Sequence, residues 1–549
     1  MKACSSSRSL TAFFLMLLAC ALGMFLAAKG IRNESVIEMN GDMPKYLMNG
    51  AYFYDLARDL LSGRASLNIF DHASRYFARY PALSLGHHPV LLGVAISPFY
   101  AIFGVSVFSA RIGMMAFLLL GIVTLYLLVK RSHDETVAAF SALIFATTPY
   151  IIQFSRIVMS ELPTISLLIL TTYFFFCYCD TDKPRYAYLL GIAFALSLYS
   201  KHLVIFMAPI YLIVLAQKKG LNALLRREVL LTIVMSGLLI APLGLMTMKF
   251  SRSNVRWVAQ ASIETRVSSS NLLFYVRVIW QRHLTLPILA LSGLGALFSL
   301  MRRDARALFF LLWIVCCYLF FTGLGIHEHA RYAIFWIPAF CVLAASVVDF
   351  FPQRWWKMAV SAVILLAIAY QTAMSAAAVP VHAKGYEDAA KYVTAHPKGD
   401  AILYSGVIDT SYFVFFVRKY DPDRTFIVLR SDKIFATSRM NKIIAERVQS
   451  KAQIHELLQK YGVGYVVLEE MPSTSQALEW LREEAHSDRF IPRATIPFDT
   501  DFRWLKQAAL GVYEYKDARP AAPEEVLDMD IPLMGETLRI RMKDLLPAK

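Results

Sequence analysis

Long apolar runs separated by short polar connections fill the first 375 residues of the chain. A helix that crosses the hydrocarbon core of a bilayer needs about 17–25 mostly apolar residues. The pattern therefore predicts eleven membrane-spanning helices. Two shorter runs, 186–199 and 203–216, meet at Ser200-Lys201-His202 and are typical of a hairpin. The nine longer runs cover residues 10–28, 107–129, 136–154, 162–179, 228–248, 284–300, 307–324, 332–350 and 356–375.

Two apolar segments have a second interpretation. Residues 89–104 are short and interrupted by Pro98, so we expect a helix that lies in the membrane interface rather than a twelfth span. The first run could be a cleaved signal peptide, because the residues around Cys20 resemble a lipobox. Its apolar character continues to Ala28, which is longer than a typical signal peptide core. We therefore expect an uncleaved anchor helix.

Charge supports the count of spans and orients them. The chain has 56 Lys and Arg against 41 Asp and Glu, a formal net charge of +15. Such a balance is typical of nucleic-acid binding, but cytoplasmic loops of membrane proteins also concentrate basic residues. With the N-terminus inside, Lys130-Arg131, Lys218-Lys219 and Arg302-Arg303 all fall in cytoplasmic connections. We therefore exclude nucleic acid as a partner and expect an inner (plasma) membrane protein with a cytoplasmic N-terminus.

The odd number of spans places everything after residue 375 outside the cytoplasm. Helical and strand patterns alternate there, which is typical of a small α/β domain. The predicted helices are 385–396 and 451–461, and the predicted strands are 401–404, 425–429 and 464–468. This region has no Gly-rich phosphate loop and no nucleophile elbow, so we expect a lid or docking domain without chemistry of its own.

The predicted fold class is thus a polytopic α-helical membrane protein with about eleven transmembrane helices and a C-terminal extracytoplasmic α/β domain. Residues 1–375 would form the transmembrane module, with 29–106 as its first extracytoplasmic loop, and 376–549 would form the α/β domain. None of the seven cysteines follows Cys341, so no disulfide is expected in that domain.

Candidate chemistry in the first outside loop centres on carboxylates. Asp42 stands just before a segment with helical periodicity, where it could take a proton from an acceptor hydroxyl or amine. It could equally serve as the N-cap of that helix, a position that Asp favours. Asp55 lies within the same periodic segment, on the side opposite its apolar face. His88 precedes Pro89 at the start of the interfacial helix.

The later outside loops contribute a carboxylate and several cations. Glu161 stands at the mouth of a span, where ionisable groups are usually paired or functional. Lys201 tips the short hairpin and could bind a phosphate as a point charge or extend to the interface. Arg331 heads a late span, followed by Tyr332, and is a candidate phosphate clamp. His327 and His329 form a His-x-His pair, a weak signal for a divalent metal ion.

The order of these features resembles the GT-C superfamily of polyprenyl-phosphate-dependent glycosyltransferases, and most closely its aminoarabinose transferase and protein O-mannosyltransferase branch. The resemblance covers roughly residues 1–350. Its motifs are an acid in a long first outside loop, the His88-Pro89 motif, the Arg-led span Ser109-Ala110-Arg111, the SR-x4-E-x-P loop at 155–163, the Lys-tipped hairpin and the late Arg331-Tyr332.

The chain departs from the family pattern at several of these motifs. Many relatives have Asp-Glu at the first acid and Asp at the second, whereas this chain has Asp42-Met43 and Glu161. The usual Lys-Pro-Pro is His88-Pro89-Val90 here. The spacing from Asp42 to Ala57-Arg58 is longer than in the aminoarabinose branch, so Asp55 remains a rival for the catalytic role. These departures leave the acceptor and the use of a metal open.

The resemblance implies a role for each candidate residue. Asp42 would be the catalytic base, and Glu161 would help to shape the acceptor or metal site. Lys201 and Arg331 would hold the donor phosphate. The remaining residues expected at the substrate are His88, Tyr332 and Asp55.

The implied reaction moves a sugar from a polyprenyl-phosphate donor to a lipid, glycan or protein acceptor at the extracytoplasmic face. It would invert the anomeric carbon, with a metal optional and no other cofactor. The main alternative is a polytopic transporter or flippase for lipid or sugar, which would place polar residues along the interiors of the spans. A membrane-anchored binding protein is a third interpretation, and it would leave Asp42 and Glu161 dispensable.

Overall fold

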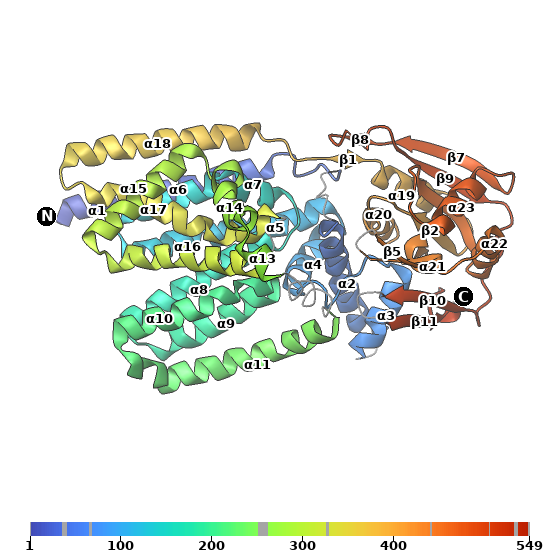
Figure 1. The fold of residues 1–549 in the computed structure, drawn as a ribbon, viewed down its shortest axis with the longest axis horizontal. Helices are drawn as coiled ribbons and strands as arrows, with labels where there is room; N and C mark the ends of the chain where they lie inside the picture. Colours follow the sequence, from blue (N-terminus) through green and yellow to red (C-terminus); the bar gives the residue numbers. More distant parts are fainter. Residues whose placement is uncertain are drawn as a thin grey trace. The chain divides into compact units, whose positions relative to one another are not determined.

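The chain divides into two compact units (Figure 1). The computed structural model describes residues 2–35, 41–64, 68–250, 262–325, 329–439, 442–503, 505–531 and 536–546. The first unit comprises Met1–Ile31, Arg111–Met248 and Ser253–Val379, and the second comprises Arg32–Ala110, Lys249–Arg252 and Pro380–Lys549. The first loop, which we assigned to the transmembrane module, thus forms one unit with the C-terminal region.

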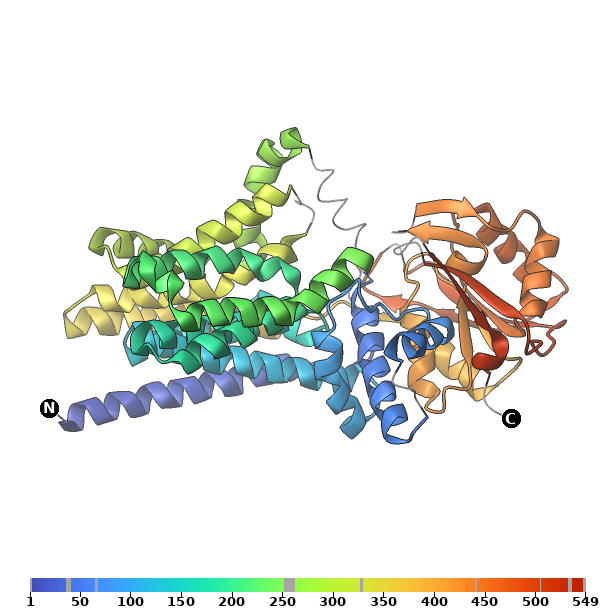
Figure 2. The ribbon, with the colours of Figure 1, turned by 90° about the horizontal axis from the view of Figure 1, so that it is seen from below.

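The first unit is a bundle of long helices that run side by side (Figures 1 and 2). Its N-terminal and central helices are α1 (Lys2–Ala28), α5 (Val107–Ser132), α6 (Glu135–Thr147), α7 (Pro149–Arg156), α8 (Glu161–Thr181), α9 (Pro184–Ser200), η1 (His202–Phe206), α10 (Met207–Lys219), η2 (Leu221–Leu225) and α11 (Arg227–Phe250). The later ones are α13 (Ile263–Val267), α14 (Ser269–Val278), η3 (Ile279–His283), α15 (Leu286–Arg302), α16 (Ala305–Leu324), η4 (Ala330–Trp336), α17 (Ile337–Phe350) and α18 (Arg354–Ala377).

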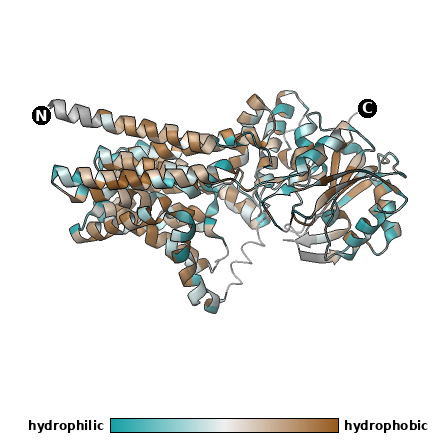
Figure 3. Ribbon diagram, turned by 90° about the horizontal axis from the view of Figure 1, so that it is seen from above, coloured by the Kyte–Doolittle hydropathy of each residue, from teal (hydrophilic) through white to brown (hydrophobic). Residues whose placement is uncertain are grey.

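Apolar residues predominate in these helices, whose ribbons are largely brown with white and teal stretches in Figure 3. Within the described part of the chain, eight helices are long and apolar enough to cross a membrane. The pair α6 and α7, bent by 55° at the break before Pro149, makes a ninth. Two of the eleven predicted runs correspond to α9 and α15, which have 17 residues each and fall below the length of the others. The prediction of a polytopic helical protein is confirmed.

Packing between these helices uses small and polar side chains as well as apolar ones. Helix α15 approaches α17 so closely that a Cβ atom at Gly295 would overlap the carbonyl of Leu343. Ser292 on α15 donates to the Phe340 carbonyl at 2.9 Å. Small residues that allow such close approach are typical of helix pairs in membranes.

A buried arginine ties α1 into the bundle. Arg156 donates to the carbonyls of Leu26, Ser375 and Ala378 at 2.7–3.1 Å. A buried guanidinium needs such partners because leaving it unsatisfied is costly. The Arg156 of the predicted second loop therefore has a structural role, and the first helix is an integral part of the bundle.

The second unit begins with three helices from the first loop: α2 (Met43–Leu61), α3 (Ile69–Arg79) and α4 (Leu91–Phe103). Pro44 in the first turn of α2 has a fixed φ that suits a helix start. Helices α2 and α4 cross closely, because a Cβ atom at Gly50 would lie 2.6 Å from the side chain of Ile96. The segment predicted as an interfacial helix is thus α4, which packs on α2.

The C-terminal part of the second unit is an α/β domain. Its helices are α19 (Tyr386–Ala395), α20 (Tyr412–Tyr420), α21 (Ser431–Ile434), α22 (Lys451–Lys460), α23 (Gln476–Ala485) and η5 (Met542–Asp544). Its strands are β1 (Ala383–Lys384), β2 (Ala401–Ser405), β3 (Ile427–Arg430), β4 (Ala436–Arg439), β5 (Lys442–Glu446), β6 (Val463–Glu469), β7 (Phe490–Pro497), β8 (Asp499–Thr500), β9 (Ala509–Tyr515), β10 (Val526–Ile531) and β11 (Glu536–Arg541).

A five-stranded mixed sheet forms the centre of this domain, in the order β3-β2-β6-β9-β7. Strands β3, β2 and β6 are parallel and wholly buried, whereas β9 and β7 are added antiparallel. Parallel strands are usually covered on both faces, which explains their continuous apolar sequences. All five elements predicted from the sequence are present, as α19, α22, β2, β3 and β6.

Buried ion pairs explain why the first loop belongs to this unit. Asp55 of α2 accepts from both Nε and Nη2 of Arg418 at 2.8 and 2.5 Å. Asp59 accepts from both terminal nitrogens of Arg424 at 2.6 Å. Ala78 of α3 lies in the same hydrophobic core as strands β2, β3 and β6. Because such bidentate pairs fix both position and orientation, α2 and α3 are integral to the C-terminal domain.

Candidate active site

In the first unit, three predicted residues meet around the carboxylate of Glu161. Glu161 is fully buried, and its Oε1 lies 2.5 Å from Lys201 Nζ and 3.7 Å from Arg331 Nε. The Tyr332 ring lies beside both cations, with Lys201 Nζ 5.3 Å and Arg331 Cζ 5.6 Å from its centre. Two cationic side chains therefore lie beside one buried carboxylate.

Two helix ends bring Glu161 and Lys201 together. Helix α8 begins at Glu161, and α9 returns beside it and ends at Ser200. Ser200 Oγ accepts from Thr164 Oγ1 at 2.8 Å and donates to the Ser160 carbonyl at 3.3 Å, which joins the two ends. The hairpin predicted from the two short runs thus places Lys201 against the first turn of α8, where the helix dipole also stabilises a carboxylate.

Arg331 and Tyr332 reach this cluster from η4, whose position is held by a buried histidine. His283 accepts from Trp336 Nε1 at its Nδ1, 2.8 Å away, and its Nε2 lies 2.9 Å from the Ala330 carbonyl. An indole can only donate and a carbonyl can only accept, so this histidine is neutral and carries its proton on Nε2. His283 therefore fastens both ends of η4 and fixes the turn that carries Arg331.

In the second unit, Asp42 lies at the start of α2 among basic and aromatic groups. Its Oδ1 is 3.4 Å from Lys45 Nζ and 3.5 Å from His88 Nε2. The His88 ring packs on Tyr46, with ring centres 4.8 Å apart. The Asp42 side chain makes no capping hydrogen bond to α2. The side-chain N-cap that the sequence left open is therefore not formed, and the role of Asp42 as a base stays a prediction.

The rival Asp55 lies in a different environment on the same helix. It is fully buried, with Arg418 on both oxygens and a hydrogen bond from Tyr76 OH at 2.8 Å. Its lone pairs are occupied by groups of its own unit. A carboxylate held in this way is suited to a structural ion pair.

The histidine pair expected as a weak metal candidate is only partly described. His327 lies outside the described residues, and the His329 ring packs on Tyr332 with ring centres 5.5 Å apart. Within the described residues, no group of three or more His, Cys, Asp or Glu side chains is arranged to hold a metal ion. A metal at His327 and His329 stays a prediction.

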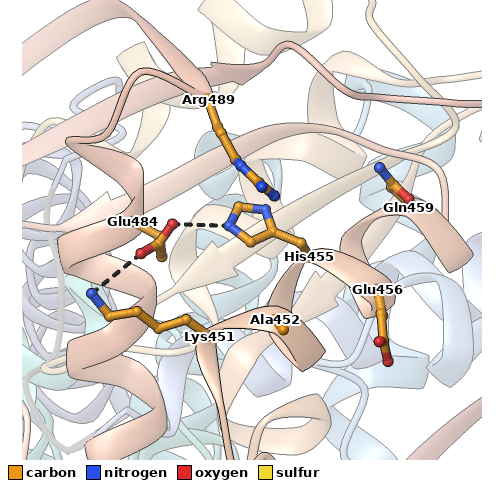
Figure 4. Close-up of a pocket in the computed structure, with 7 residues that line it drawn as sticks. All are labelled: Lys451, Ala452, His455, Glu456, Gln459, Glu484 and Arg489. Atoms are coloured by element: carbon orange, nitrogen blue, oxygen red, sulfur yellow. Dashed lines mark hydrogen bonds and ion pairs between the residues drawn. The ribbon is translucent and has the colours of Figure 1, made fainter.

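A hollow of about 410 Å³ lies in the α/β domain, away from all of these residues in the sequence (Figure 4). Lys451 is paired with Glu484 at 3.2 Å, and Glu484 also holds His455 at 2.9 Å. The residues that line the hollow are Lys451, Ala452, His455, Glu456, Gln459, Glu484 and Arg489. None of the predicted site residues contributes to it, so we do not assign the reaction to this hollow.

Sequence reasoning overlooked two residues beside the predicted ones. Lys45 stands three residues after Asp42, a spacing that brings side chains together on a helix and could have been recognised. His283 is far in sequence from η4, and an isolated histidine in an apolar context carries no signal of its own. Its role became visible only from its two hydrogen bonds.

Comparisons with known proteins agree with this architecture. Residues 87–245 match the family profile described as dolichyl-phosphate-mannose-protein mannosyltransferase. That segment contains His88, Glu161 and Lys201, and makes up less than a third of the chain. A sequence search among curated proteins found no match.

Solved structures resemble the chain over most of its length. ArnT from Cupriavidus metallidurans, bound to undecaprenyl phosphate, matches with a TM-score of 0.60 and 15% identity over 92% of this chain and 99% of ArnT. The archaeal oligosaccharyltransferase AglB from Archaeoglobus fulgidus, in complex with an inhibitory peptide and a dolichol-phosphate, matches with a TM-score of 0.55 and 15% identity over 83% of this chain and 69% of AglB.

A third structure, the arabinofuranosyltransferase AftD from Mycobacteria, matches with a TM-score of 0.53 and 14% identity over 94% of this chain and 41% of AftD. At these identities the likeness establishes the fold.

Proposed function

Because the chain has the GT-C glycosyltransferase fold, we propose that it transfers a sugar from a polyprenyl-phosphate donor to an acceptor. The resemblance predicted from the order of the motifs is confirmed at the level of this fold. The observation that carries the proposal is the pair of cations, Lys201 and Arg331, held on one buried carboxylate, Glu161. Undecaprenyl phosphate bound to ArnT and dolichol-phosphate bound to AglB support a lipid phosphate as the ligand.

The two cations are assigned to the donor phosphate. Lys201 supplies a compact charge, and the planar guanidinium of Arg331 presents several donors to phosphate oxygens. As the bond between the anomeric carbon and the phosphate oxygen breaks, the electron pair leaves with the polyprenyl phosphate. Fixed positive charges stabilise that developing charge and thus lower the barrier.

Asp42 is assigned to the acceptor. Its carboxylate takes the proton from the acceptor hydroxyl or amine while the acceptor oxygen or nitrogen bonds to the anomeric carbon. A single in-line displacement inverts the anomeric configuration. His88, 3.5 Å from Asp42, is assigned to orient that carboxylate and the acceptor.

The proposed location is the inner (plasma) membrane, with the N-terminus in the cytoplasm and the reaction at the extracytoplasmic face. The distribution of Lys and Arg in the short connections supports this orientation. A reporter fused after Lys549 should be active only outside the cytoplasm. Cytoplasmic activity of that fusion would contradict the orientation.

The acceptor class and metal use are the finer parts of the proposal. A lipid, a glycan and a protein are all chemically suitable, because each carries hydroxyl or amine groups. We expect transfer to continue in EDTA, since Lys201 and Arg331 already provide positive charge for the phosphate. Loss of transfer in EDTA, restored by Mg²⁺ or Mn²⁺, would instead assign His327 and His329 to a metal.

The deciding experiment uses the purified full chain in detergent with a panel of undecaprenyl-phosphate-linked sugars and candidate acceptors. We expect release of undecaprenyl phosphate and formation of a glycosylated product. Asp42→Asn should lower the rate by about 10²–10⁴-fold while leaving binding of undecaprenyl phosphate unchanged. Wild-type turnover in Asp42→Asn would overturn the assignment. Transfer in detergent, without compartments, would also exclude a pure transporter or flippase.

Binding of undecaprenyl phosphate alone tests the second assignment without knowledge of the sugar. Lys201→Met and Arg331→Met should each weaken binding by about 10–100-fold, the effect of losing one charge-assisted contact. Lys130→Met is the matched control, because Lys130 also pairs with a glutamate, Glu135, at 2.7 Å in a cytoplasmic connection of the proposed topology. Equal affinity in the three variants would refute the phosphate site.

A further inference from the structure

The segment that carries Asp42 is held by the C-terminal domain at two points, and both adjoin helix α20. Arg418, near the end of α20, holds Asp55 in the fourth turn of α2 with two hydrogen bonds. Asp409, just before α20, lies beside Gly41, since a Cβ atom at Gly41 would stand 3.4 Å from Asp409 Oδ2. Helices α2 and α20 also pack on each other. Asp55 is thus bonded to the C-terminal domain, and Gly41, just before α2, lies against Asp409.

Asp409 is itself fixed on every side. Its Oδ1 accepts from the backbone nitrogens of Ser411 and Tyr412 at 2.7 and 2.6 Å and so caps α20. Its own nitrogen donates to Glu469 Oε1 at 3.3 Å, and its carbonyl accepts from Tyr404 OH at 2.7 Å. Because four groups of the domain hold it, Asp409 is a rigid reference point for Gly41 and for the residue that follows, Asp42.

Lys45 connects the two aspartates electrostatically. It lies 3.4 Å from Asp42 Oδ1, and its charge acts to lower the pKa of Asp409. Burial raises the pKa of Asp409, while hydrogen bonds from Tyr412 and Ser411 and the charges of Lys45 and Arg430 act in the opposite direction. The positive charge of Lys45 thus acts on two carboxylates, the partly exposed Asp42 and the buried Asp409.

We infer that Asp409 is a positioning residue for the base Asp42, acting through Gly41 and Lys45, and that the α/β domain is therefore part of the catalytic apparatus. This inference rests on the proposed function and extends it. A second negative charge beside Lys45 keeps that lysine from neutralising Asp42 alone, and so preserves the proton affinity that a base needs. The expectation of a lid or docking domain without chemistry is replaced by that of a scaffold for the base.

Several titratable groups lie near Asp42 and Asp409, and a test must distinguish their titration from that of the two aspartates. Lys45 of α2 and His88, ahead of α4, face Asp42. Arg430 of β3 and Glu469 of β6 face Asp409. Because a histidine titrates near neutral pH, each profile described below is measured in the wild-type background and again with His88→Gln.

The test is the pH dependence of kcat for the full-length protein in detergent, with a donor that supports transfer. Asp409→Asn keeps an oxygen that can cap α20 but removes the negative charge. We expect the acidic limb of the profile to move to lower pH and kcat to fall several-fold, with KM for the donor unchanged. Lys45→Met should move the same limb to higher pH, because Asp42 then loses its nearest positive charge.

Asp400→Asn is the matched control. Asp400 also accepts a backbone N–H in the α/β domain, from Ala521 at 2.7 Å, and the described residues show no contact between its side chain and the first loop. Its profile should coincide with that of the wild type. If Asp409 had only a structural role, Asp409→Asn would lower activity equally at every pH. If Asp409 acts on the base Asp42, the acidic limb of the kcat profile shifts.

Hydrogen exchange provides a readout that is independent of activity. In Asp409→Ala, residues 43–50 should exchange faster than in the wild type, and in Asp400→Ala they should not. Unshifted limbs in both Asp409→Asn and Lys45→Met, with Asp42→Asn inactive, would overturn this inference alone. Full activity of Asp42→Asn would overturn the proposed function instead. If Asp409→Asn does not fold, the partly exposed Lys45→Met still decides between the outcomes.

Discussion

The two carboxylate clusters of the molecule differ in how tightly their acids are held. Glu161, in the first unit, is fully buried and has Lys201 at 2.5 Å. Asp42, in the second unit, retains 18% exposure of its side chain, and Lys45 Nζ and His88 Nε2 stand 3.4 and 3.5 Å from its Oδ1. Both acids precede or begin a helix and both face a lysine, yet one is enclosed and the other is accessible.

This difference in burial and in partner distance suits the two acids to different roles in the proposed reaction. A buried carboxylate with two cations stabilises those cations and is hard to protonate by a substrate that cannot reach it. A partly exposed carboxylate with looser partners can accept a proton and release it. Under the proposed function, Asp42 would be the reacting group, and Glu161 would hold in place the two cations assigned to the phosphate.

The largest expected effect distinguishes the two acids by stability. Glu161→Gln leaves Lys201 and Arg331 without their buried counter-charge, and should lower the free energy of unfolding by about 3–5 kcal/mol. Asp42→Asn should change it by less than about 0.5 kcal/mol, as for other partly exposed sites. Unfolding by SDS in mixed micelles measures both. Equal free energies of unfolding for Glu161→Gln and Asp42→Asn would show that the two acids do not differ in their contribution to stability.

A second test uses two acids on one helix. Asp55→Asn breaks the buried pair with Arg418 and should destabilise the second unit by about 3 kcal/mol. The double variant Asp55→Asn with Arg418→Met should recover part of that loss, because no uncompensated charge is left. Proteolysis of the C-terminal domain in the full-length protein reports on its opening. Unchanged protection of Asp55→Asn would return Asp55 to the list of candidate bases.

A smaller effect is expected at the support of the phosphate cluster. His283→Ala leaves the Trp336 indole and the Ala330 carbonyl unsatisfied, at a cost of about 1–3 kcal/mol. Because η4 then loses both fastenings, the affinity for undecaprenyl phosphate should fall by about 10-fold. His283→Gln, which keeps a donor, should restore part of the affinity. Wild-type affinity in His283→Ala would show that Arg331 is held by other contacts.

The smallest effect concerns acid stability of the second unit. Burial raises the pKa of Asp59, but hydrogen bonds and charge from Arg424 and His72 outweigh it and lower the pKa to about 2. Since this is below the unfolded value of 3.8, the stabilisation is present above about pH 4 and is lost as the pH falls toward 2. Partial solvent screening reduces it to about 1 kcal/mol.

The destabilisation caused by Asp59→Asn should accordingly be visible at pH 7 and vanish near pH 2. Unfolding of the wild type and the variant at both pH values measures it. Asp71→Asn, which breaks the exposed pair with Arg75, is the control and should have little effect at either pH. If Asp59→Asn destabilised the protein equally at pH 7 and pH 2, the predicted loss of stabilisation at low pH would be contradicted.

Apolar run length predicted the bundle well, because a span must satisfy its backbone within itself and so reveals its length locally. The hairpin at Lys201 and the Arg331-Tyr332 turn were recognised for the same reason: each lies at the end of an apolar run. The strands β2, β3 and β6 were predicted from continuous apolar segments, whereas α20 and β9 were missed because their patterns also suit other elements.

Contacts between distant parts of the second unit could not be predicted. Asp55 and Asp59 look like exposed polar positions of an amphipathic helix, and only the structure shows that Arg418 and Arg424 cover them. A charged side chain in a sequence does not reveal which partner will bury it. For the same reason the assignment of residues 29–106 to the membrane module did not foresee their grouping with the C-terminal domain.

The pairing of Asp55 with Arg418 also implies a delay during biosynthesis before the pair can form. The two residues are 363 positions apart, and translation at about 5–20 residues per second separates their synthesis by roughly 20–70 s. During that interval α2 carries two carboxylates whose final partners have not yet been made. The first loop therefore lacks both partners until residue 424 of the 549 has been synthesised. The second unit therefore reaches its final packing only after both the first loop and the C-terminal region have been made.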